Sequence, residues 1–211
     1  MLEDIAVELN KIMNERTSDY TLVTNVNNMQ MSDYMKGYFN EPKYHELCKQ
    51  CNKYGTLWSC PPYSFNVEDY IKKYKYVHLI GTKVLLSEKL IKETKPEDVI
   101  DSTYKIINSV RKKLRVVLLN LEKQYPGSVA LYAGSCIICD KCTRPQNKPC
   151  VHPNTMRYSL ESLGFDVFKT ASELLDIEIK WAKEALPEYL TLVSAFFTNE
   201  DIKALGGFDF V

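Results

Sequence analysis

The sequence predicts an α/β fold. We expect one domain over residues 1–211, with a small mixed sheet flanked by helices and two cysteine-rich loops at one end. Three observations lead to this prediction. Four short runs are rich in the β-branched and aromatic residues typical of strands. One long segment repeats apolar residues at helical spacing. The seven cysteines lie in two tight groups, in a chain of 211 residues that is long enough to bury a sizeable core.

The strands and the long helix alternate along the chain. The helix covers 97–124, with Pro96 and acidic residues at its start and Pro126 and Gly127 at its end. Because a strand precedes it and another follows it, we expect a β-α-β unit with a site beyond the carboxyl end of the second strand. The expected strands lie near residues 20–26, 76–86, 128–133 and 189–197.

Shorter helices are expected on either side of these elements. Apolar residues at intervals of three and four predict an amphipathic helix over 2–15. Asn66 is expected to cap a helix over 67–73, and Gly164 to end a helix that starts at His152 and points its N-terminus at Cys150. The other expectations are helices over 171–175 (capped by Thr170) and 177–186, irregular chain over 34–44 and a loose tail over 206–211.

The loop 134–153 carries the pattern C-x2-C-x2-C-x7-C. Three thiolates at this spacing suit one face of an iron–sulfur cubane better than a zinc tetrahedron, and ferredoxin-type loops add a cysteine beside a proline. Zinc sites more often use two C-x2-C pairs or cysteine–histidine pairs. We therefore predict a [4Fe–4S] cluster here, with zinc as the alternative. The predicted ligands are Cys136, Cys139, Cys142 and Cys150.

The loop 45–62 carries C-x2-C-x8-C-P-P, with the predicted ligands Cys48, Cys51 and Cys60. Gly55 permits the turn that would return Cys60 to the pair. Three thiolates leave one coordination position for a histidine, a carboxylate, a remote cysteine, water or a substrate. The neighbouring aromatic residues either shield a cofactor or belong to the core. These aromatic residues are Tyr54 and Trp58, and the histidines that compete for the fourth position are His45, His78 and His152.

The division of the seven thiols between two centres is open. In two-cluster ferredoxins the fourth cysteine of a run binds the other cluster. Cys150 could likewise join Cys48, Cys51 and Cys60 and leave the triple of the second loop one thiolate short. Either division gives four thiolates at one centre and three at the other.

The chain resembles the predicted metal-binding protein family, a domain-of-unknown-function family of anaerobic bacteria and archaea. The resemblance covers about residues 45–200. It implies metal binding through the cysteines and implies no known reaction. The residues that carry it are Cys48-x2-Cys51-x2-Tyr54-Gly55, Cys60-Pro61-Pro62, Gly134-x-Cys136-x2-Cys139-x2-Cys142, Pro149-Cys150-x-His152-Pro153 and Arg157-x-Ser159-Leu160-Glu161-x2-Gly164.

The amino-acid composition limits the kinds of partner that the chain is expected to bind. Basic and acidic residues balance at 27 each, whereas a nucleic-acid binder usually has a basic excess. The acidic start is unlike a signal peptide, and no apolar run reaches the length of a membrane span, so we expect a cytoplasmic protein that binds neither membrane nor nucleic acid. In a reducing compartment, grouped cysteines indicate metal and not disulfides. The basic residues of the long helix are expected on a solvated face: Arg111, Lys112, Lys113 and Arg115.

Two function classes follow from these observations. In the first, the chain is an iron–sulfur redox protein with one or two [4Fe–4S] clusters. One cluster relays electrons, and an open-site cluster acts on a small anionic or sulfur-containing substrate, as an oxidoreductase would. Its partner is then a redox protein or the small molecule. In the second, both loops are structural zinc sites of an interaction module without catalysis. Three basic residues would steer an anion in the first case and are plain surface in the second: Arg144, Lys148 and Arg157.

Overall fold

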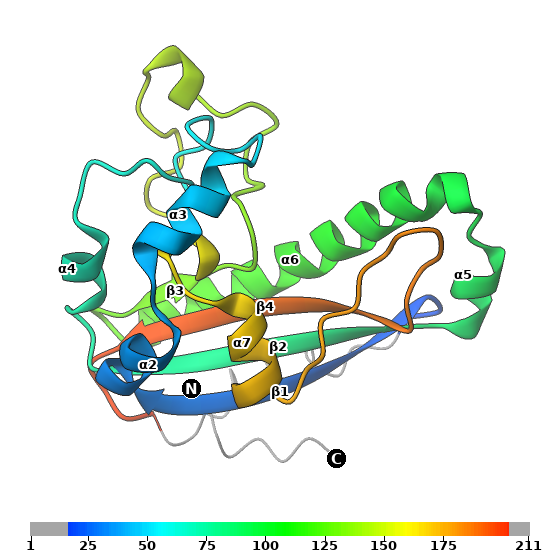
Figure 1. Ribbon diagram of the computed structural model, residues 1–211, viewed down its shortest axis with the longest axis horizontal. Coiled ribbons are helices and arrows are strands. Elements are labelled where there is room, and N and C mark those ends of the chain that lie inside the picture. The colour runs from blue at the N-terminus through cyan, green and yellow to red at the C-terminus, as the bar shows by residue number, and fades with distance from the viewer. Residues whose placement is uncertain (1–16, 203–211) are drawn as a thin grey trace.

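A computed structural model describes residues 17–202. Its centre is a four-stranded antiparallel sheet in the order β1-β2-β4-β3 (Figure 1). The predicted α/β fold with four strands and a long helix is confirmed. The expected helix over 2–15 and the tail over 206–211 lie outside the described residues. The strands are β1 (Tyr20–Gln30), β2 (Tyr76–Leu86), β3 (Val129–Leu131) and β4 (Tyr189–Thr198).

The position of β4 changes the form of the predicted β-α-β unit. Because β4 is antiparallel to both β2 and β3, those two strands point in the same direction, as expected, but they are not neighbours. This is a split β-α-β arrangement. The reason lies in burial, since most residues of β4 are buried and such a strand belongs in the middle of a sheet.

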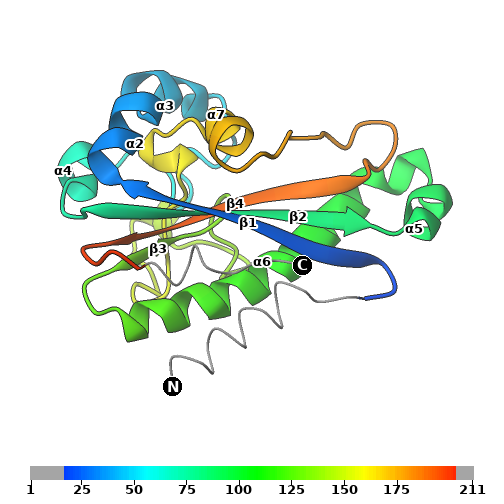
Figure 2. The same cartoon turned by 90° about the horizontal axis from the view of Figure 1, so that it is seen from below.

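Helix α6 (Val99–Gln124) covers one face of the sheet, after a 3-10 turn at Pro96–Asp98 (Figure 2). Its apolar stripe, which includes Val117 and Leu121, packs on side chains such as Ile80 and Phe196. These strand residues have even numbers, because alternate residues of a strand face opposite sides. The short helix α5 (Glu88–Glu93), capped by Ser87, was not predicted.

Short helices and loops cover the other face, where Phe197 and Val193 meet Tyr34 and Phe165. The expectation of irregular chain over 34–44 is wrong. Asn40 accepts a hydrogen bond from the Lys43 N–H and so starts a helix at a place where the sequence shows mainly turn-forming residues. The elements on this face are α2 (Met31–Tyr38), α3 (Glu41–Lys49), α4 (Val67–Ile71), α7 (Val167–Lys169) and a π-helical turn (Thr170–Leu174). As predicted, Asn66 caps α4.

Two other elements differ from prediction because of contacts between distant segments of the chain. Strand β1 continues to Gln30, beyond its expected end near residue 26, because Asn25 and Asn27 donate hydrogen bonds to the carbonyls of Leu175 and Leu174. The helix expected from His152 is wrong; only turns and a 3-10 turn at Glu161–Leu163 form. The Tyr132 N–H binds the Tyr158 carbonyl, which draws the chain alongside the end of β3 and prevents a helix.

The helix expected over 177–186 is also wrong, since residues 175–188 contain neither helix nor strand. Ile177 lies so close to β2 that a Cβ on Gly81 would stand 2.6 Å from its Cδ1 atom, and this contact holds the segment flat on the sheet. Asp166, not Thr170, caps the helix before it, and Thr170 is buried against the Tyr34 hydroxyl. None of the helices in residues 17–202 has the length and apolar content to cross a membrane.

Candidate metal centre

The two cysteine loops lie against each other above one end of the sheet, as predicted (Figure 1). The Cys136 N–H donates a hydrogen bond of 3.0 Å to the Ser59 hydroxyl oxygen. The Trp58 indole N–H donates another of 3.1 Å to the Lys148 carbonyl. Each bond joins one loop to the other, so segments about 80 residues apart in sequence form one surface.

Arg144 makes the strongest connection between the loops. Its guanidinium donates to the carbonyl oxygens of Leu57, at 2.6 Å, and of Cys60 and Pro62. It also lies 5.3 Å from the centre of the Trp58 ring. Charged donors on carbonyls are stronger than neutral hydrogen bonds. Arg144 therefore fixes the backbone of the first loop on both sides of Cys60.

The first loop turns as the sequence predicts. Cys48 lies in the last turn of α3, and Gly55 adopts a left-handed conformation with φ +67°. The Gly55 N–H binds the Pro61 carbonyl at 2.8 Å, which closes the loop and returns Cys60 towards Cys48 and Cys51. Cys60 is buried, whereas Cys51 is exposed at the rim.

The thiols of the first loop influence one another. Burial raises the pKa of Cys60 to about 11; the Ser59 hydroxyl opposes this, and Cys51 and Cys48 add to it. Burial also raises the pKa of Cys48, with further contributions from Glu161 and Cys51. The three thiols therefore lie near enough to influence one another electrostatically.

The thiols of the second loop form a separate group. The pKa of Cys136 is raised by burial, lowered by the Ile138 N–H, and raised further by Cys139, Cys150 and Cys142. Burial, followed by Cys150 and Cys142, also raises the pKa of Cys139. The structure therefore places Cys150 with the cysteines of its own loop.

Backbone N–H groups point at one thiol of the first loop and at two thiols of the second. The Lys53 N–H lies 3.5 Å from the Cys51 sulfur, and the His152 N–H lies 3.4 Å from the Cys150 sulfur. In both cases, and for Ile138 with Cys136, the donor belongs to the residue two positions after the cysteine. Sulfur that accepts such donors is oriented by the backbone of its own turn.

Metal binding would draw the thiols closer than they lie here. Within residues 17–202, no set of three or more histidine, cysteine or acidic side chains is arranged to hold a metal ion. The described thiols are free, with no disulfide among them. The donor set suits a thiolate-bound metal, whose binding releases the thiol protons.

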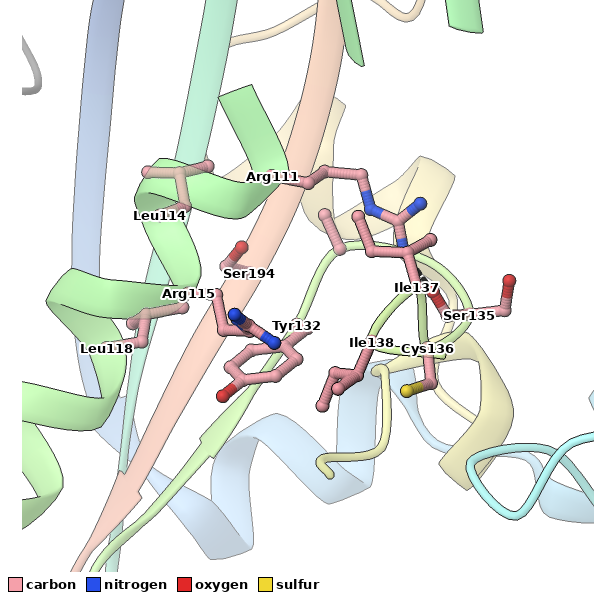
Figure 3. A pocket seen from close by; sticks show the side chains of 11 residues that line it. Arg111, Leu114, Arg115, Leu118, Tyr132, Ser135, Cys136, Ile137, Ile138 and Ser194 are labelled. Carbon is pink, nitrogen blue, oxygen red and sulfur yellow. Dashed lines mark hydrogen bonds between the residues drawn. The ribbon is translucent and has the colours of Figure 1, made fainter. Parts of the chain in front are cut away.

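Two arginines of α6 border the second loop, so the expectation that they lie on a solvated face is wrong. Arg111 donates to the Ser135 carbonyl, and Arg111 and Arg115 line a small cavity with Tyr132 and Cys136 (Figure 3). Burial lowers the pKa of Arg111, while Glu161 and Cys136 raise it. These side chains place positive charge beside Cys136, where a cluster with four thiolates would carry negative charge.

The three basic residues that could steer an anion have different settings. Arg144 is engaged by the carbonyls of the first loop. Arg157 forms a half-buried ion pair with Glu122, which also accepts the Ala130 N–H at 2.6 Å. Only Lys148 has an exposed side chain. Arg144 and Arg157 thus hold the scaffold together.

The histidines proposed for the open position lie apart from it or are engaged. His45 contacts the Ser162 carbonyl at 3.1 Å through Nε2 and Glu41 at 3.4 Å through Nδ1. His78 is buried on the α6 face of the sheet, 2.6 Å from the Asn28 side chain, and burial lowers its pKa to about 4. His152 follows Cys150 on an exposed turn.

Aromatic rings separate the loops from the core. Tyr63 stacks on Phe65 and meets Tyr158 edge-on, and its hydroxyl donates to the Ser59 carbonyl at 3.0 Å. Trp58, in contrast, lies half-buried between the two loops, so it belongs to their contact and not to the core. Tyr54 is also half-buried.

Sequence reasoning missed that Ser59 and Arg144 join the two loops and that Arg111 ties the second loop to α6. The serine precedes a proposed ligand and the arginine lies between two of them, but neither position has a pattern that reveals its partner. Arg111 follows the helical repeat like any surface residue. Only the folded chain shows these contacts.

Comparison with known proteins agrees with this chemistry. The family model described as predicted metal-binding protein (domain of unknown function 2284) matches residues 35–196, a range that includes both loops. No curated protein and no solved structure matches the chain.

Proposed function

We propose, from the premise that this chain belongs to the predicted metal-binding protein family, that it is an iron–sulfur redox protein. Cys136, Cys139, Cys142 and Cys150 would hold one [4Fe–4S] cluster. The first loop would hold a second cluster through Cys48, Cys51 and Cys60. When bound, such clusters supply one-electron transfer.

The observation that carries this proposal is the grouping of the thiols into four and three on two loops that touch. A closed set of four thiolates suits a relay, whereas a metal centre with one position open is the usual mark of a reactive site. The spacing of Cys136, Cys139 and Cys142 favours a cubane over zinc. The N–H donors aimed at sulfur support thiolate ligation in both loops.

The contact between the loops supports electron transfer between the two centres. Ser59 accepts the Cys136 N–H and lies 3.8 Å from the Cys60 sulfur, so one small side chain connects the two groups. Arg144 keeps the carbonyls around Cys60 turned towards itself, and Arg111 and Arg115 provide positive charge beside Cys136. These residues would hold the loops in a fixed relation and favour the anionic, metal-bound state.

The first test is the metal content of anaerobically purified protein. We expect iron and acid-labile sulfide, a brown colour, and loss of about four irons per chain in Cys139→Ser, because an unmetallated loop keeps its conformational entropy and loses its local fold. The adjacent Asp140→Asn is the matched control and should keep its iron. Zinc in place of iron, or unchanged iron in Cys139→Ser, contradicts the proposal.

The second test concerns the open position in the first loop. Electron paramagnetic resonance of the reduced protein should show one cluster signal that shifts when cyanide or a small thiol is added. Cys60→Ser should remove that shift and leave the signal of the four-cysteine cluster. A spectrum unchanged by both ligands would mean that no exchangeable position exists, and the three-cysteine centre would then be a second relay.

A further inference from the structure

A cavity of about 450 Å³ lies beside the sheet, and its lining residues come from outside the two cysteine loops. It opens where α6 and the segment 175–188 flank β4 (Figure 1). Strand β3 pairs only with residues 195–197 of β4, so among the described residues the stretch before them has no strand on that side. The size falls in the range of small-molecule sites, and loops as long as 175–188 without regular structure are often functional.

The rim of the cavity is aromatic and exposed. Phe168 and Trp181 lie with ring centres 5.7 Å apart, and Tyr104 faces the cavity from α6. Their exposed fractions are 55%, 64% and 63%. Ile100 also lines the cavity, so four of the eight large exposed apolar side chains of the described residues gather here, and the three rings among them indicate a surface for a flat apolar group.

The floor of the cavity is polar and rich in donors. The hydroxyls of Thr191 and Thr103 are buried and have no hydrogen-bond partner within residues 17–202. The adjoining cavity of about 220 Å³ shares Thr191 and Glu161 and adds Arg111, whose Nε–H is also buried without a partner. An arginine N–H can only donate, and a threonine hydroxyl can do so. Unpaired buried donors are costly unless a ligand supplies acceptors.

We infer that this cavity binds a planar aromatic compound with a neutral carbonyl group. The ring would lie between Trp181, Phe168 and Tyr104, and the carbonyl oxygen would accept from Thr191 and the neighbouring donors.

A neutral group fits the charges of the floor. Glu161 and Arg111 are already neighbours of opposite charge, so their charges offset each other. Burial raises the pKa of Glu161, while Ser159, Arg111 and the Gly134 N–H act against this. An anionic ligand would meet this carboxylate, whereas a carbonyl is compatible with either protonation state.

The position of the cavity relates it to the metal centre. Gly134 and Arg111 border the smaller cavity, and both lie next to Cys136, the first thiol of the second loop. If the proposed redox function holds, the aromatic carbonyl compound is the class of substrate or electron acceptor that this site presents to the four-cysteine centre. The binding itself uses no metal, so it can be tested apart from that function.

The test uses calorimetry on the anaerobically purified, metal-loaded protein, with iron measured in the same sample. The probe is 2-naphthamide, compared with 2-naphthoate and with cyclohexanecarboxamide. We expect 2-naphthamide to bind best. Trp181→Ala should weaken it about tenfold, because a stacking ring is lost. Thr191→Val should weaken it about fivefold, because valine has nearly the shape of threonine but lacks the hydroxyl donor.

The matched control is Val116→Ala, which removes an exposed apolar side chain (52% exposed) of α6 outside the cavity and should leave the affinity unchanged. Any of four results would overturn the inference. The first is no binding of 2-naphthamide at about 1 mM, and the second is unaltered affinity in both cavity variants. The third is equal binding of cyclohexanecarboxamide, and the fourth is tighter binding of 2-naphthoate. Iron present without binding refutes the cavity and leaves the proposed function standing. Binding of 2-naphthamide by protein that contains no iron would support the cavity site and refute the proposed iron–sulfur function.

Discussion

The two cysteine loops differ in what holds them. The second loop is fixed to the scaffold at both ends: Arg111 of α6 binds the Ser135 carbonyl, and Arg157 pairs with Glu122 of the same helix. The first loop leaves α3 and enters α4, but its interior is held from outside by Arg144, a residue of the second loop.

This difference implies an order of dependence. A perturbation that loosens the second loop should also loosen the first, because Arg144 would move with it. A perturbation of Arg144 alone should loosen only the first. The three-cysteine group, which we propose to be the reactive centre, would therefore take its geometry from the loop that carries the closed one.

The largest expected effect follows from breaking the anchor of the second loop. Glu122→Gln leaves the half-buried Arg157 without its charge partner, which should cost about 3 kcal/mol of unfolding free energy in urea titrations. Hydrogen exchange should rise in both loops. Glu97→Gln, at an exposed position in the 3-10 turn before the same helix, should change neither. Faster exchange in 135–152 with unchanged exchange in 55–62 would contradict the order of dependence.

An intermediate effect comes from the sheet that supports both loops. His78 is buried and its pKa is lowered to about 4, so the unfolded chain binds a proton that the folded chain excludes between that pH and about 6.5. Stability should therefore fall as pH drops through this window, by about 2 kcal/mol at pH 5. His78→Gln should flatten this dependence. Because the sheet carries both loops, acid should raise exchange in both alike; a change confined to one loop would show that the loops do not share this support.

The smallest expected effect comes from Arg144, the residue of the second loop that holds the first loop. Arg144→Gln removes partly exposed charged hydrogen bonds to three carbonyls and should cost about 1–2 kcal/mol. Exchange should rise in 55–62, and an open-site signal from the first loop should broaden, while 135–142 keeps its protection. Lys148→Gln removes the same charge from the same loop but keeps the backbone carbonyl through which Lys148 bonds to Trp58, and should have no effect. Equal loosening of both loops in Arg144→Gln would mean that they support each other mutually.

Much of the fold follows from local pattern. Strand β2 and the body of α6 lie where their apolar residues predict them, because β2 is a continuous buried run and α6 buries one apolar stripe that ends just before Pro126 and Gly127. The turn at Gly55 is also predictable from local sequence, because glycine readily adopts the left-handed conformation found there. Prediction failed where a distant partner decides the structure: Asn25 extends β1, Gly81 admits Ile177, and Tyr132 holds Tyr158 extended.

The candidate site likewise has features that local sequence predicts and features that only the folded chain shows. The spacing of the seven cysteines is a property of the sequence, and it alone predicts a thiolate-bound metal, in agreement with the family to which the chain belongs. Tertiary structure decided that Cys150 lies with its own loop, that Arg144 joins the two loops, and that a donor-lined cavity lies at the edge of β4. The physical reason is the separation in sequence between the residues that interact. Spacing within a turn fixes which thiols can converge, whereas contacts between residues about 80 positions apart exist only after the sheet has brought them together.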